Sequence, residues 1–387
     1  EEPPGEEPPG EEPPGEEPPG EEPPGEEPPP PPADSGDRQL SGPISLSGQS
    51  DVVIENLLVS NPGGDCIVVT GGSNVTIRNS TIGPCGGEAV YLSDVSGASI
   101  TGNTVTDTAN GVLVHRSTSV RVDNNTFRHA GRNFVQFDKV TGSGSSISGN
   151  RGENALGGSN AEDLISVYMS GGTSGSPLRV VGNHLRNGGP SNSGSGIMLG
   201  DGGGGHVIVE GNALVNPGQV GIGVASGTDI TVTGNSVYSE ALPWSNVGIY
   251  VWNQYGSACG NIQITNNQVN WTAAGGYANP WYNGGGCSNV TESGNNWGAD
   301  IDPAEEPAAK ALLAEEPAAD QLPAEEAPAE EPPAEEAPAE EAPAEEPPAE
   351  EPPAEEPPAE EAPAEEPPAE EPPAEEPPAE EPPAEEA

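Results

Sequence analysis

Ile100-Thr-Gly-Asn103-Thr-Val105 and Val232-Thr-Gly-Asn235-Ser-Val237 are two copies of a motif that occurs ten times between residues 51 and 297. A copy has an apolar residue, two small or polar residues, an Asn and a second apolar residue. Five of the nine start-to-start spacings are 22 to 25 residues, and the others are 28 to 33. This period, which tolerates insertions, predicts a solenoid whose stacked coils bury one another's apolar faces. The weaker copies begin at Ile54, Ile77, Ile147 and Glu292.

Each coil is expected to consist of β-strands. Apolar and polar residues alternate, Val, Ile and Thr are frequent, and no helical periodicity extends over ten residues. Gly, Asn and Ser interrupt the strands and supply the left-handed backbone conformations that sharp corners need. The Asn of the motif would occupy the same corner of successive coils, where its amide can hydrogen-bond the next Asn.

These repeats resemble those of the right-handed parallel β-helix proteins, which include pectate lyases, alginate lyases and epimerases, and periplasmic carbohydrate-binding β-helices. The resemblance covers about residues 40 to 300. It implies an all-β, right-handed parallel β-helix solenoid of about ten coils and a polysaccharide context. The hexapeptide period of left-handed β-helices fits the repeats less well.

Composition divides the chain into an arm of Glu-Glu-Pro-Pro-Gly repeats (1–32), a central β-helix (33–302) and an arm of Pro-Ala-Glu-Glu-Pro repeats (303–387). The arms carry most of the net charge of −52, because the centre holds only 20 of 63 acidic residues and 10 of 11 basic ones. With little apolar surface to bury, the arms are expected to be polyproline-II-like or disordered. They are either solvated spacers or a glycosylated stalk that self-assembles. A helical turn is expected only at 308–313.

Four cysteines indicate an exported protein. Cys259 and Cys287 each lie five residues before a motif copy, so they should be adjacent in neighbouring coils. Of the three connectivities we favour Cys66–Cys85 with Cys259–Cys287, and free thiols are the alternative. The chain is interpreted as a product of an exported precursor whose signal peptide lies outside the given sequence, hence secreted or at the cell surface.

Other partners and cofactors have little support in the sequence. No apolar run approaches 18 residues, so no membrane span is expected, and neither is a nucleic-acid partner. The chain has four His and no Cys-x-x-Cys, which argues against zinc. We expect no cofactor and no metal site; Ca²⁺ is left open without a motif to indicate it.

A functional face can be located by aligning the second strand of each coil. Residues two apart in a strand share a face. The aligned positions that should point inward include Val112, Val114, Ile222, Val224, Ile249 and Val251. On the outward face, the fifth position of successive strands is His115, Asp138 and Tyr168, and Gly200 follows in the next coil.

The predicted row has the residue types that uronate chemistry requires. A cation such as Arg116 or Lys139 would neutralise the substrate carboxylate, while His115 or Tyr168 moves the C5 proton. We therefore predict a catalytic group of His115, Arg116, Asp138, Lys139 and Tyr168. An ordinary solvated surface, with outward residues covered by the long loops, is the alternative.

Substrate contacts are expected on the same outward face and further along the solenoid. Aromatic rings suit the flat apolar faces of sugars. Gly200, Gly223 and Ala225 are expected to leave a trough between the two clusters. The predicted substrate-binding residues are Tyr91, Gln136, Ser166, Asp201, Tyr250 and Trp252.

Resemblance to particular enzymes is partial. The stretch from Ala161 to Ser170 resembles the alginate lyase and chondroitinase B group, but Tyr168 stands at the catalytic Lys position. Gly64-Asp65-Cys66-Ile67 resembles polygalacturonases without their second Asp or the later His-Gly and Arg-Ile-Lys. The Asp-Pro-His of mannuronan epimerases is absent.

Two classes of function follow. In the first, an extracellular β-helix binds, and cleaves or epimerises, an acidic or neutral polysaccharide while the arms act as spacers. Whether the site is catalytic is left open; an enzyme would be a polysaccharide lyase or uronate epimerase. In the second, the chain is a non-enzymatic subunit of an extracellular fibre or surface layer, with the arms as its stalk.

Overall fold

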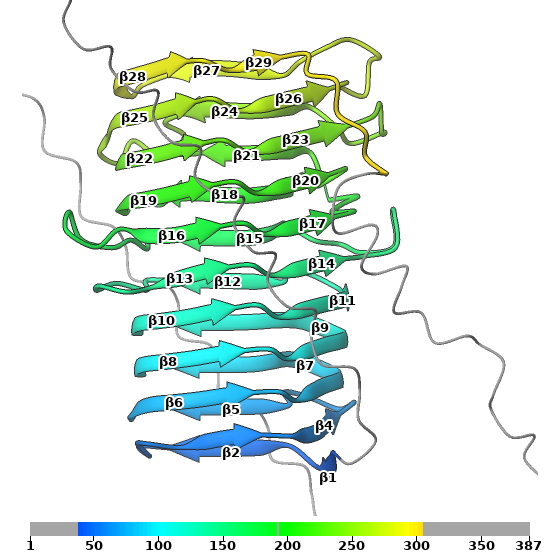
Figure 1. Cartoon of the computed structure of the whole chain (residues 1–387), viewed down its shortest axis with the longest axis vertical. Helices are drawn as coiled ribbons and strands as arrows, with labels where there is room; N and C mark the ends of the chain where they lie inside the picture. The colour runs from blue at the N-terminus through cyan, green and yellow to red at the C-terminus, as the bar shows by residue number, and fades with distance from the viewer. Residues whose placement is uncertain (1–37, 192, 305–387) are drawn as a thin grey trace, which may run out of the picture. The chain divides into compact units, whose positions relative to one another are not determined.

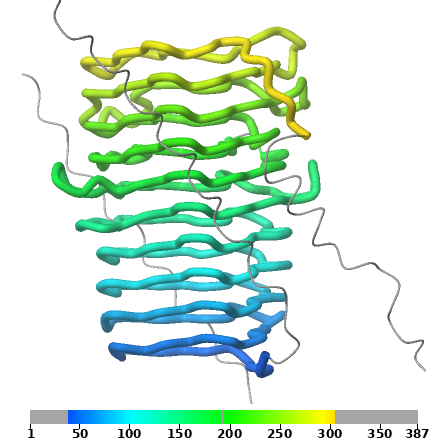
Figure 2. Tube along the Cα trace, in the orientation of Figure 1, coloured from blue at the N-terminus to red at the C-terminus, as the bar shows by residue number. Residues whose placement is uncertain are grey.

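The computed structural model describes residues 38–191 and 193–304, which form a parallel β-helix of about ten coils (Figures 1 and 2). All pairings between the named strands are parallel, and these residues contain no α-helix. None of the described residues therefore forms a helix able to cross a membrane. The predictions made for residues 1–32, for 308–313 and for nearly all of 303–387 lie outside the described residues.

The coils place their strands in three columns. The first column is a separate ten-stranded sheet. The second and third columns form one 19-stranded sheet, because β7 (Thr81–Ser93) and β9 (Thr104–His115) pass through both. The first column consists of β3 (Val53–Glu55), β6 (Ser73–Arg78), β8 (Ser96–Thr101), β10 (Thr118–Asp123), β13 (Ser146–Ser148), β16 (Leu178–Val181), β19 (Gly205–Glu210), β22 (Gly227–Thr233), β25 (Cys259–Thr265) and β28 (Ser288–Ser293).

The other two columns complete each coil. The second column adds β1 (Gln39–Ser41), β4 (Leu57–Asn61), β11 (Thr126–Ala130), β14 (Arg151–Glu153), β17 (His184–Arg186), β20 (Ala213–Val215), β23 (Ser236–Ser239), β26 (Gln268–Trp271) and β29 (Asn296–Trp297) to β7 and β9. The third column adds β2 (Ile44–Ser47), β5 (Ile67–Thr70), β12 (Val135–Asp138), β15 (Asp163–Tyr168), β18 (Ser195–Asp201), β21 (Val220–Val224), β24 (Val247–Trp252) and β27 (Trp281–Gly285).

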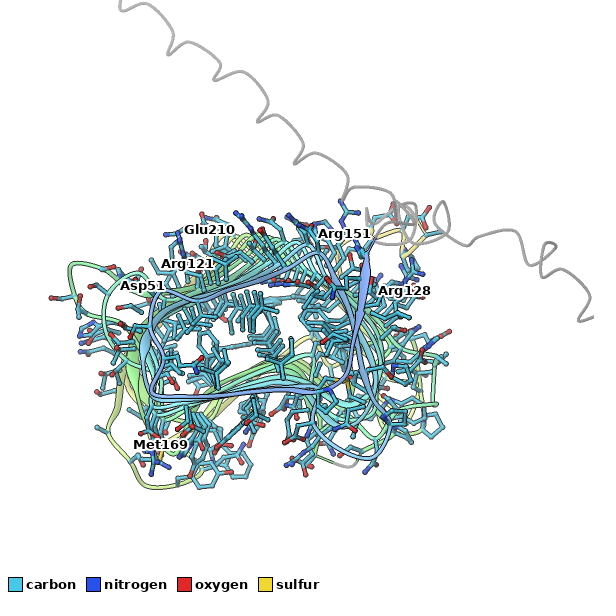
Figure 3. The ribbon with its side chains drawn as sticks, turned by 90° about the horizontal axis from the view of Figure 1, so that it is seen from below. Asp51, Arg121, Arg128, Arg151, Met169 and Glu210 are labelled. Carbon is cyan, nitrogen blue, oxygen red and sulfur yellow. A yellow bond between two sulfur atoms is a disulfide. The ribbon has the colours of Figure 1, made fainter. Side chains whose placement is uncertain are left out.

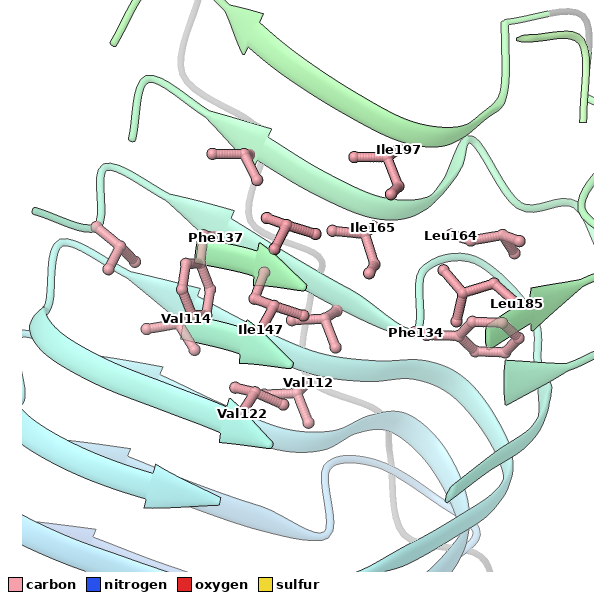
Figure 4. Close-up of a cluster of buried hydrophobic side chains, with 14 of the residues drawn as sticks. Val112, Val114, Val122, Phe134, Phe137, Ile147, Leu164, Ile165, Leu185 and Ile197 are labelled. Carbon is pink, nitrogen blue, oxygen red and sulfur yellow. The ribbon is translucent and has the colours of Figure 1, made fainter. Parts of the chain in front are cut away.

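The core fills the interior of the coils with rows of aliphatic side chains, seen along the solenoid axis in Figure 3. In the third column Val112 pairs with Val135, Val135 with Ile165, and Ile165 with Ile197, so similar side chains stack coil on coil (Figure 4). The inward predictions are confirmed, because these six side chains are buried: Val112, Val114, Ile222, Val224, Ile249 and Val251.

The Asn of the repeated motif forms a ladder along the corner between the first and second columns. In each step an Asn Nδ2 donates to the Oδ1 of the next Asn at 2.8–3.1 Å. The residue before each ladder Asn has positive φ and is Gly or Asn, which tolerate that conformation best. The predicted stacking is thus confirmed for Asn103, Asn125, Asn150, Asn183, Asn212, Asn235, Asn267 and Asn295.

Both predicted disulfides are present. Cys66 and Cys85 are bonded with Cα atoms 5.7 Å apart, and Cys259 and Cys287 with Cα atoms 4.6 Å apart. Each bond joins adjacent coils, and the spacing from the motif predicted this adjacency for Cys259 and Cys287. Disulfides persist in oxidising compartments, so the pairs indicate such an environment for the β-helix.

Candidate functional site

The third column brings the predicted row together. β9, β12 and β15 pair so that His115, Asp138 and Tyr168 stand opposite one another. Arg116 and Lys139 follow at the corners of their coils, with φ of 44° and 59°. Positive φ is uncommon for residues other than Gly and Asn and stores strain. The two cations are therefore fixed at unusual backbone positions beside the row.

Four of these residues form a connected cluster, called here the ladder cluster (His115, Asp138, Lys139 and Tyr168). The His115 Nδ1 lies 2.7 Å from Asp138 Oδ2, and Lys139 Nζ lies 3.4 Å from Asp138 Oδ1. The same Nζ lies 5.7 Å from the centroid of the Tyr168 ring, within the range of a cation–π contact. Asp138 thus contacts both the His115 and the Lys139 side chains.

Arg116 is also paired with a carboxylate. Its Nε and Nη2 donate to the two Asp94 carboxylate oxygens at 3.1 and 2.8 Å. These hydrogen bonds, with a further one from Ser93, hold the pKa of Asp94 below its usual range. Arg116 is therefore engaged by a carboxylate one coil away, which reduces its availability to an anionic ligand.

The prediction that Gly200 continues the row after Tyr168 is wrong. A β-bulge between β15 and β18 shifts the register, so that Tyr168 pairs with Asp201. Gly200 is the extra residue; it has φ of 64°, and a Cβ there would lie 1.9 Å from the Ser226 carbonyl oxygen. The row is therefore His115, Asp138, Tyr168, Asp201.

The predicted trough at Gly200, Gly223 and Ala225 is also wrong. Gly200 packs against backbone, and Ala225 is buried. The space above Gly223 is filled by the Tyr250 ring, whose atoms would lie 2.8–2.9 Å from a Cβ there. Small residues here accommodate a neighbouring ring instead of opening a groove.

A cavity of about 490 Å³ instead opens further along the third column, over β15, β18, β21, β24 and β27. This volume is within the range of small-molecule sites. Beside Ser193, Met198, Val220 and Val247, its walls contain carboxylates, amides and aromatic rings. The carboxylates are Glu162, Asp163 and Asp201; the amides are Gln219, Asn246 and Gln254; and the aromatics are Tyr250, Trp252, Tyr255 and Tyr282.

Asp163 is the most perturbed carboxyl of the cavity. It begins β15, is half-buried, and accepts a hydrogen bond from the Ser195 backbone N–H at 3.1 Å. Burial raises the pKa of Asp163 to about 7, and the nearby Asp201 charge adds to this, while hydrogen bonds from Ser195 and Ser166 lower it. Asp163 is therefore partly protonated at neutral pH.

Asp201 and two tyrosines complete the polar part of the cavity. Burial raises the pKa of Asp201. The Tyr255 hydroxyl donates a hydrogen bond to the Asp201 carboxylate, which partly offsets this rise. Tyr250 is buried, and its hydroxyl accepts a 2.8 Å hydrogen bond from Gln254 Nε2. Burial, with the charges of Asp163 and Asp201, raises the pKa of Tyr250, so its hydroxyl stays protonated.

Exposed aromatic rings form the rim. Trp252, Tyr255 and Tyr282 are 45%, 57% and 50% exposed. The Trp252 ring lies against Gly284 on the next strand, where a Cβ would come within 2.4 Å of it. A glycine at 284 therefore lets the indole pack closely against the neighbouring backbone.

The predicted substrate-binding residues divide into two groups. Asp201, Tyr250 and Trp252 line the cavity, whereas Tyr91, Gln136 and Ser166 are absent from its lining. Ser166 and Tyr250 are each only 5% exposed, so neither side chain is freely accessible on the outward face.

Eleven of the fourteen lining residues were outside the predicted set, among them Glu162, Asp163, Gln254, Tyr255 and Tyr282. The acidic pair before the apolar β15 was visible in the stretch quoted from Ala161. The loop residues had no periodic signal. Within the described residues no group of three or more His, Cys, Asp or Glu is placed to hold a metal ion.

Comparison with known families supports the fold. Residues 42–189 match the family model described as "Right handed beta helix region". The described β-helix continues without a break in its strand columns beyond that segment. The resemblance to right-handed parallel β-helix proteins is thereby confirmed. No curated protein is a significant match to the chain.

Several solved structures share the solenoid at low identity. An alginate lyase from a Paenibacillus species has 17% identity and a TM-score of 0.39, with 63% of this chain and 99% of that chain covered. A GH87 α-1,3-glucanase from Streptomyces thermodiastaticus has 17% identity and a TM-score of 0.37, covering 68% and 63%. A DFA-IIIase from Arthrobacter chlorophenolicus has 14% identity and a TM-score of 0.36, covering 65% and 55%. We take no activity from these likenesses.

Proposed function

We propose that the third column binds an extended, neutral polysaccharide, part of which lies in the cavity. The observation that carries this proposal is the cavity wall itself, where exposed aromatic rings stand beside carboxylates and amides. Sugars offer both an apolar ring face and a ring of hydroxyls, so a site for them needs both kinds of group. A secreted or cell-surface location fits such a ligand and remains part of the proposal.

Charge favours a neutral polymer over a uronate. The cavity lining has three carboxylates and no Lys, Arg or His. The basic side chains nearest along the same face are engaged: Arg132 with Glu162, Lys139 with Asp138, and Arg116 with Asp94. A polymer with a carboxylate on each sugar would be repelled by the cavity.

The test is binding to neutral glucans, mannans, galactans and xylans, compared with alginate and polygalacturonate, by affinity electrophoresis. We expect a neutral polymer to bind with little dependence on salt, since screening affects charge–charge attraction. Trp252→Ala should weaken binding by about 1–3 kcal/mol if a sugar stacks on the indole. Tyr277→Ala is the control, because Tyr277 is 58% exposed and does not line the cavity. Tighter binding of alginate or polygalacturonate than of every neutral polymer would contradict the proposal.

A second candidate is proton transfer on a uronate at the ladder cluster. The observation that favours it is the contact network, in which Asp138 holds His115 at 2.7 Å while Lys139 lies over the Tyr168 ring. Such a cluster has a proton-transferring His and Tyr beside a cation. Asp201, next in the row, would then contact the adjoining sugar, as would Tyr91 and Gln136 on the same outward face.

Tyr168→Phe tests this candidate because only the hydroxyl is removed. If Tyr168 moves the C5 proton, the variant should bind alginate or polygalacturonate as the wild type does, but form no unsaturated or epimerised product. Equal turnover by the two proteins would exclude Tyr168 from the chemistry.

A further inference from the structure

Asp163 and Asp201 occupy one cavity but have different surroundings. Asp163 stands at the start of β15, half-buried, and accepts a hydrogen bond from the Ser195 backbone N–H. Asp201 ends β18 beyond the bulge and accepts a hydrogen bond from the hydroxyl of Tyr255, a rim residue that is 57% exposed. We propose that these two carboxyl groups hydrolyse a glycosidic bond of the bound polymer, with Asp163 as general acid and Asp201 as general base. This inference rests on the proposed function and assigns it a reaction.

The division of roles follows from the surroundings. Burial raises the pKa of Asp163 to about 7, so a substantial fraction carries a proton at neutral pH. Burial raises the pKa of Asp201 as well, but the hydrogen bond from Tyr255 opposes this effect. Two carboxyls whose environments separate their pKa values are the arrangement that glycoside hydrolysis uses.

Among the titratable groups around Asp163, the Asp201 charge adds to the effect of burial on its pKa. Glu162 precedes it and is paired with Arg132, and Asp201 faces it from β18. Tyr250 from β24 and Tyr255 from the following loop also interact with Asp163, and burial raises both tyrosine pKa values, so they remain neutral hydroxyls. The cavity therefore presents no cation that would force Asp163 to ionise.

The reaction balances with water as the only co-reactant. The Asp163 O–H protonates the glycosidic oxygen, and the bond from that oxygen to the anomeric carbon breaks with its electron pair passing to the oxygen. Water attacks the anomeric carbon, and its proton passes to the Asp201 carboxylate. One bond of the polymer is replaced by two hydroxyl groups. Transfer of a proton from Asp201 to Asp163 through solvent restores the starting state.

A reducing-end assay with the same neutral polymers tests the reaction separately from binding. We expect the bound polymer to yield one new reducing end per bond broken and no unsaturated product. Asp163→Asn and Asp201→Asn should each lower kcat/KM by ~10²- to 10⁴-fold, the usual contribution of acid–base catalysis. Their affinity for the polymer should change little.

Asp123→Asn is the matched control. Asp123 ends β10 in the first column, and burial raises its pKa too, yet it hydrogen-bonds Ser146 and Ser148 away from the cavity. This variant should keep wild-type activity. A 4-nitrophenyl glycoside of the sugar that is hydrolysed gives a further test, because its leaving oxygen needs no proton. Asp163→Asn should recover activity on it, and Asp201→Asn should not.

A measurement on the unmodified protein avoids any dependence on variant folding. Carboxyl ¹³C titration, assigned with Asp163→Asn, should give Asp163 a midpoint near 7, and Asp201→Asn should lower that midpoint because a neighbouring charge is removed. A midpoint in the ordinary Asp range overturns the acid role. Binding without new reducing ends overturns hydrolysis and leaves the proposed function standing, whereas no binding to any neutral polymer removes both.

Discussion

The first and third columns are built from the same repeat but present different surfaces. The first column has exposed ion pairs between neighbouring coils, such as Arg78 with Glu55 and Arg179 with Glu210. The third column has the ladder cluster and the aromatic cavity. Figure 3 shows Glu210 and Arg121 on one flank of the solenoid and Met169 at a corner of the opposite one. The repeat thus sets the frame, and other features distinguish the faces.

Those other features are the insertions. The long coils starting at Ile147, Val180 and Val232 carry loops that add Glu162, Ser193, Asn246 and Gln254 to the cavity wall. The bulge before Asp201 then turns that carboxyl into the row. Departures from the 23-residue period therefore coincide with the candidate site, in keeping with function lying on loops over a rigid scaffold.

The largest expected effect is on the stability that the Asn ladder gives to the whole β-helix. Asn183, in the middle of the Asn ladder, donates to Asn212 Oδ1 and to the Ile147 carbonyl and accepts from Asn150. Asn183→Ala should lower the free energy of unfolding by roughly 3 kcal/mol, because it leaves buried partners unsatisfied. Urea unfolding measures this. Asn296→Ala, which removes one exposed hydrogen bond to Gln268, should have little effect; equal losses would show that the ladder is not a stabilising element.

The next prediction concerns how the stability contributed by one carboxyl group on each face depends on pH. The folded-state pKa of Asp163 is raised to about 7, so the folded protein binds more protons than the unfolded chain between about pH 4 and 7. The stability that Asp163 contributes is fully present below the pKa of Asp in the unfolded chain, about 4, and is lost as pH rises through 7. The stability of the wild type relative to Asp163→Asn should therefore fall over that window, by a few kcal/mol at most.

Unfolding of both proteins in urea at pH 4, 5.5, 7 and 8 checks this difference. Asp123→Asn provides the comparison on the first column, where burial raises the pKa of Asp123 while two hydrogen bonds oppose the effect. We expect the same direction for Asp123. If the difference in free energy of unfolding between the wild type and Asp163→Asn stays constant with pH, the raised pKa of Asp163 is contradicted.

A smaller effect is expected from Gly→Ala substitutions, because a glycine on the third column is closely packed and one beside the first column is not. Gly223→Ala places a methyl 2.8 Å from the Tyr250 ring, so the ring must move, and stability should fall by about 1–3 kcal/mol together with polymer binding. Gly175→Ala lies in the loop before β16 of the first column and meets nothing within 4 Å, so neither property should change. Thermal unfolding and affinity electrophoresis give the two readouts. Unchanged binding in Gly223→Ala would show that Tyr250 is not part of the binding wall.

Local repetition explains what the sequence alone could predict. A residue in a coil contacts its equivalents one repeat away, so alignment of copies gave the inward face, the Asn ladder, the Cys259–Cys287 disulfide and the pairing of His115, Asp138 and Tyr168. None of these features requires knowledge of a distant contact.

The features that were missed depend on breaks in the repeat. One extra residue at Gly200 moved Asp201 into the row, and a one-residue shift turns a side chain to the other face. The position of Tyr255 depends on the conformation of the loop after β24. Tyr250 is buried with its own ring packed over Gly223. Periodicity has no information on either.

The smallest expected effect decides between the two candidate ligands. Arg78–Glu55 on the first column and Arg116–Asp94 on the third are both exposed ion pairs, with arginine side chains 47% and 57% exposed. Removing either should leave stability nearly unchanged, because water screens such pairs. If the third column binds a neutral polymer in the cavity, Arg78→Ala and Arg116→Ala should also bind it equally. If instead the ladder cluster holds a uronate, Arg116→Ala alone should lose affinity for alginate or polygalacturonate, and increasingly so as salt is lowered. Titration of both variants with both kinds of polymer at two salt concentrations therefore distinguishes a binding surface set by aromatic rings from one set by charge.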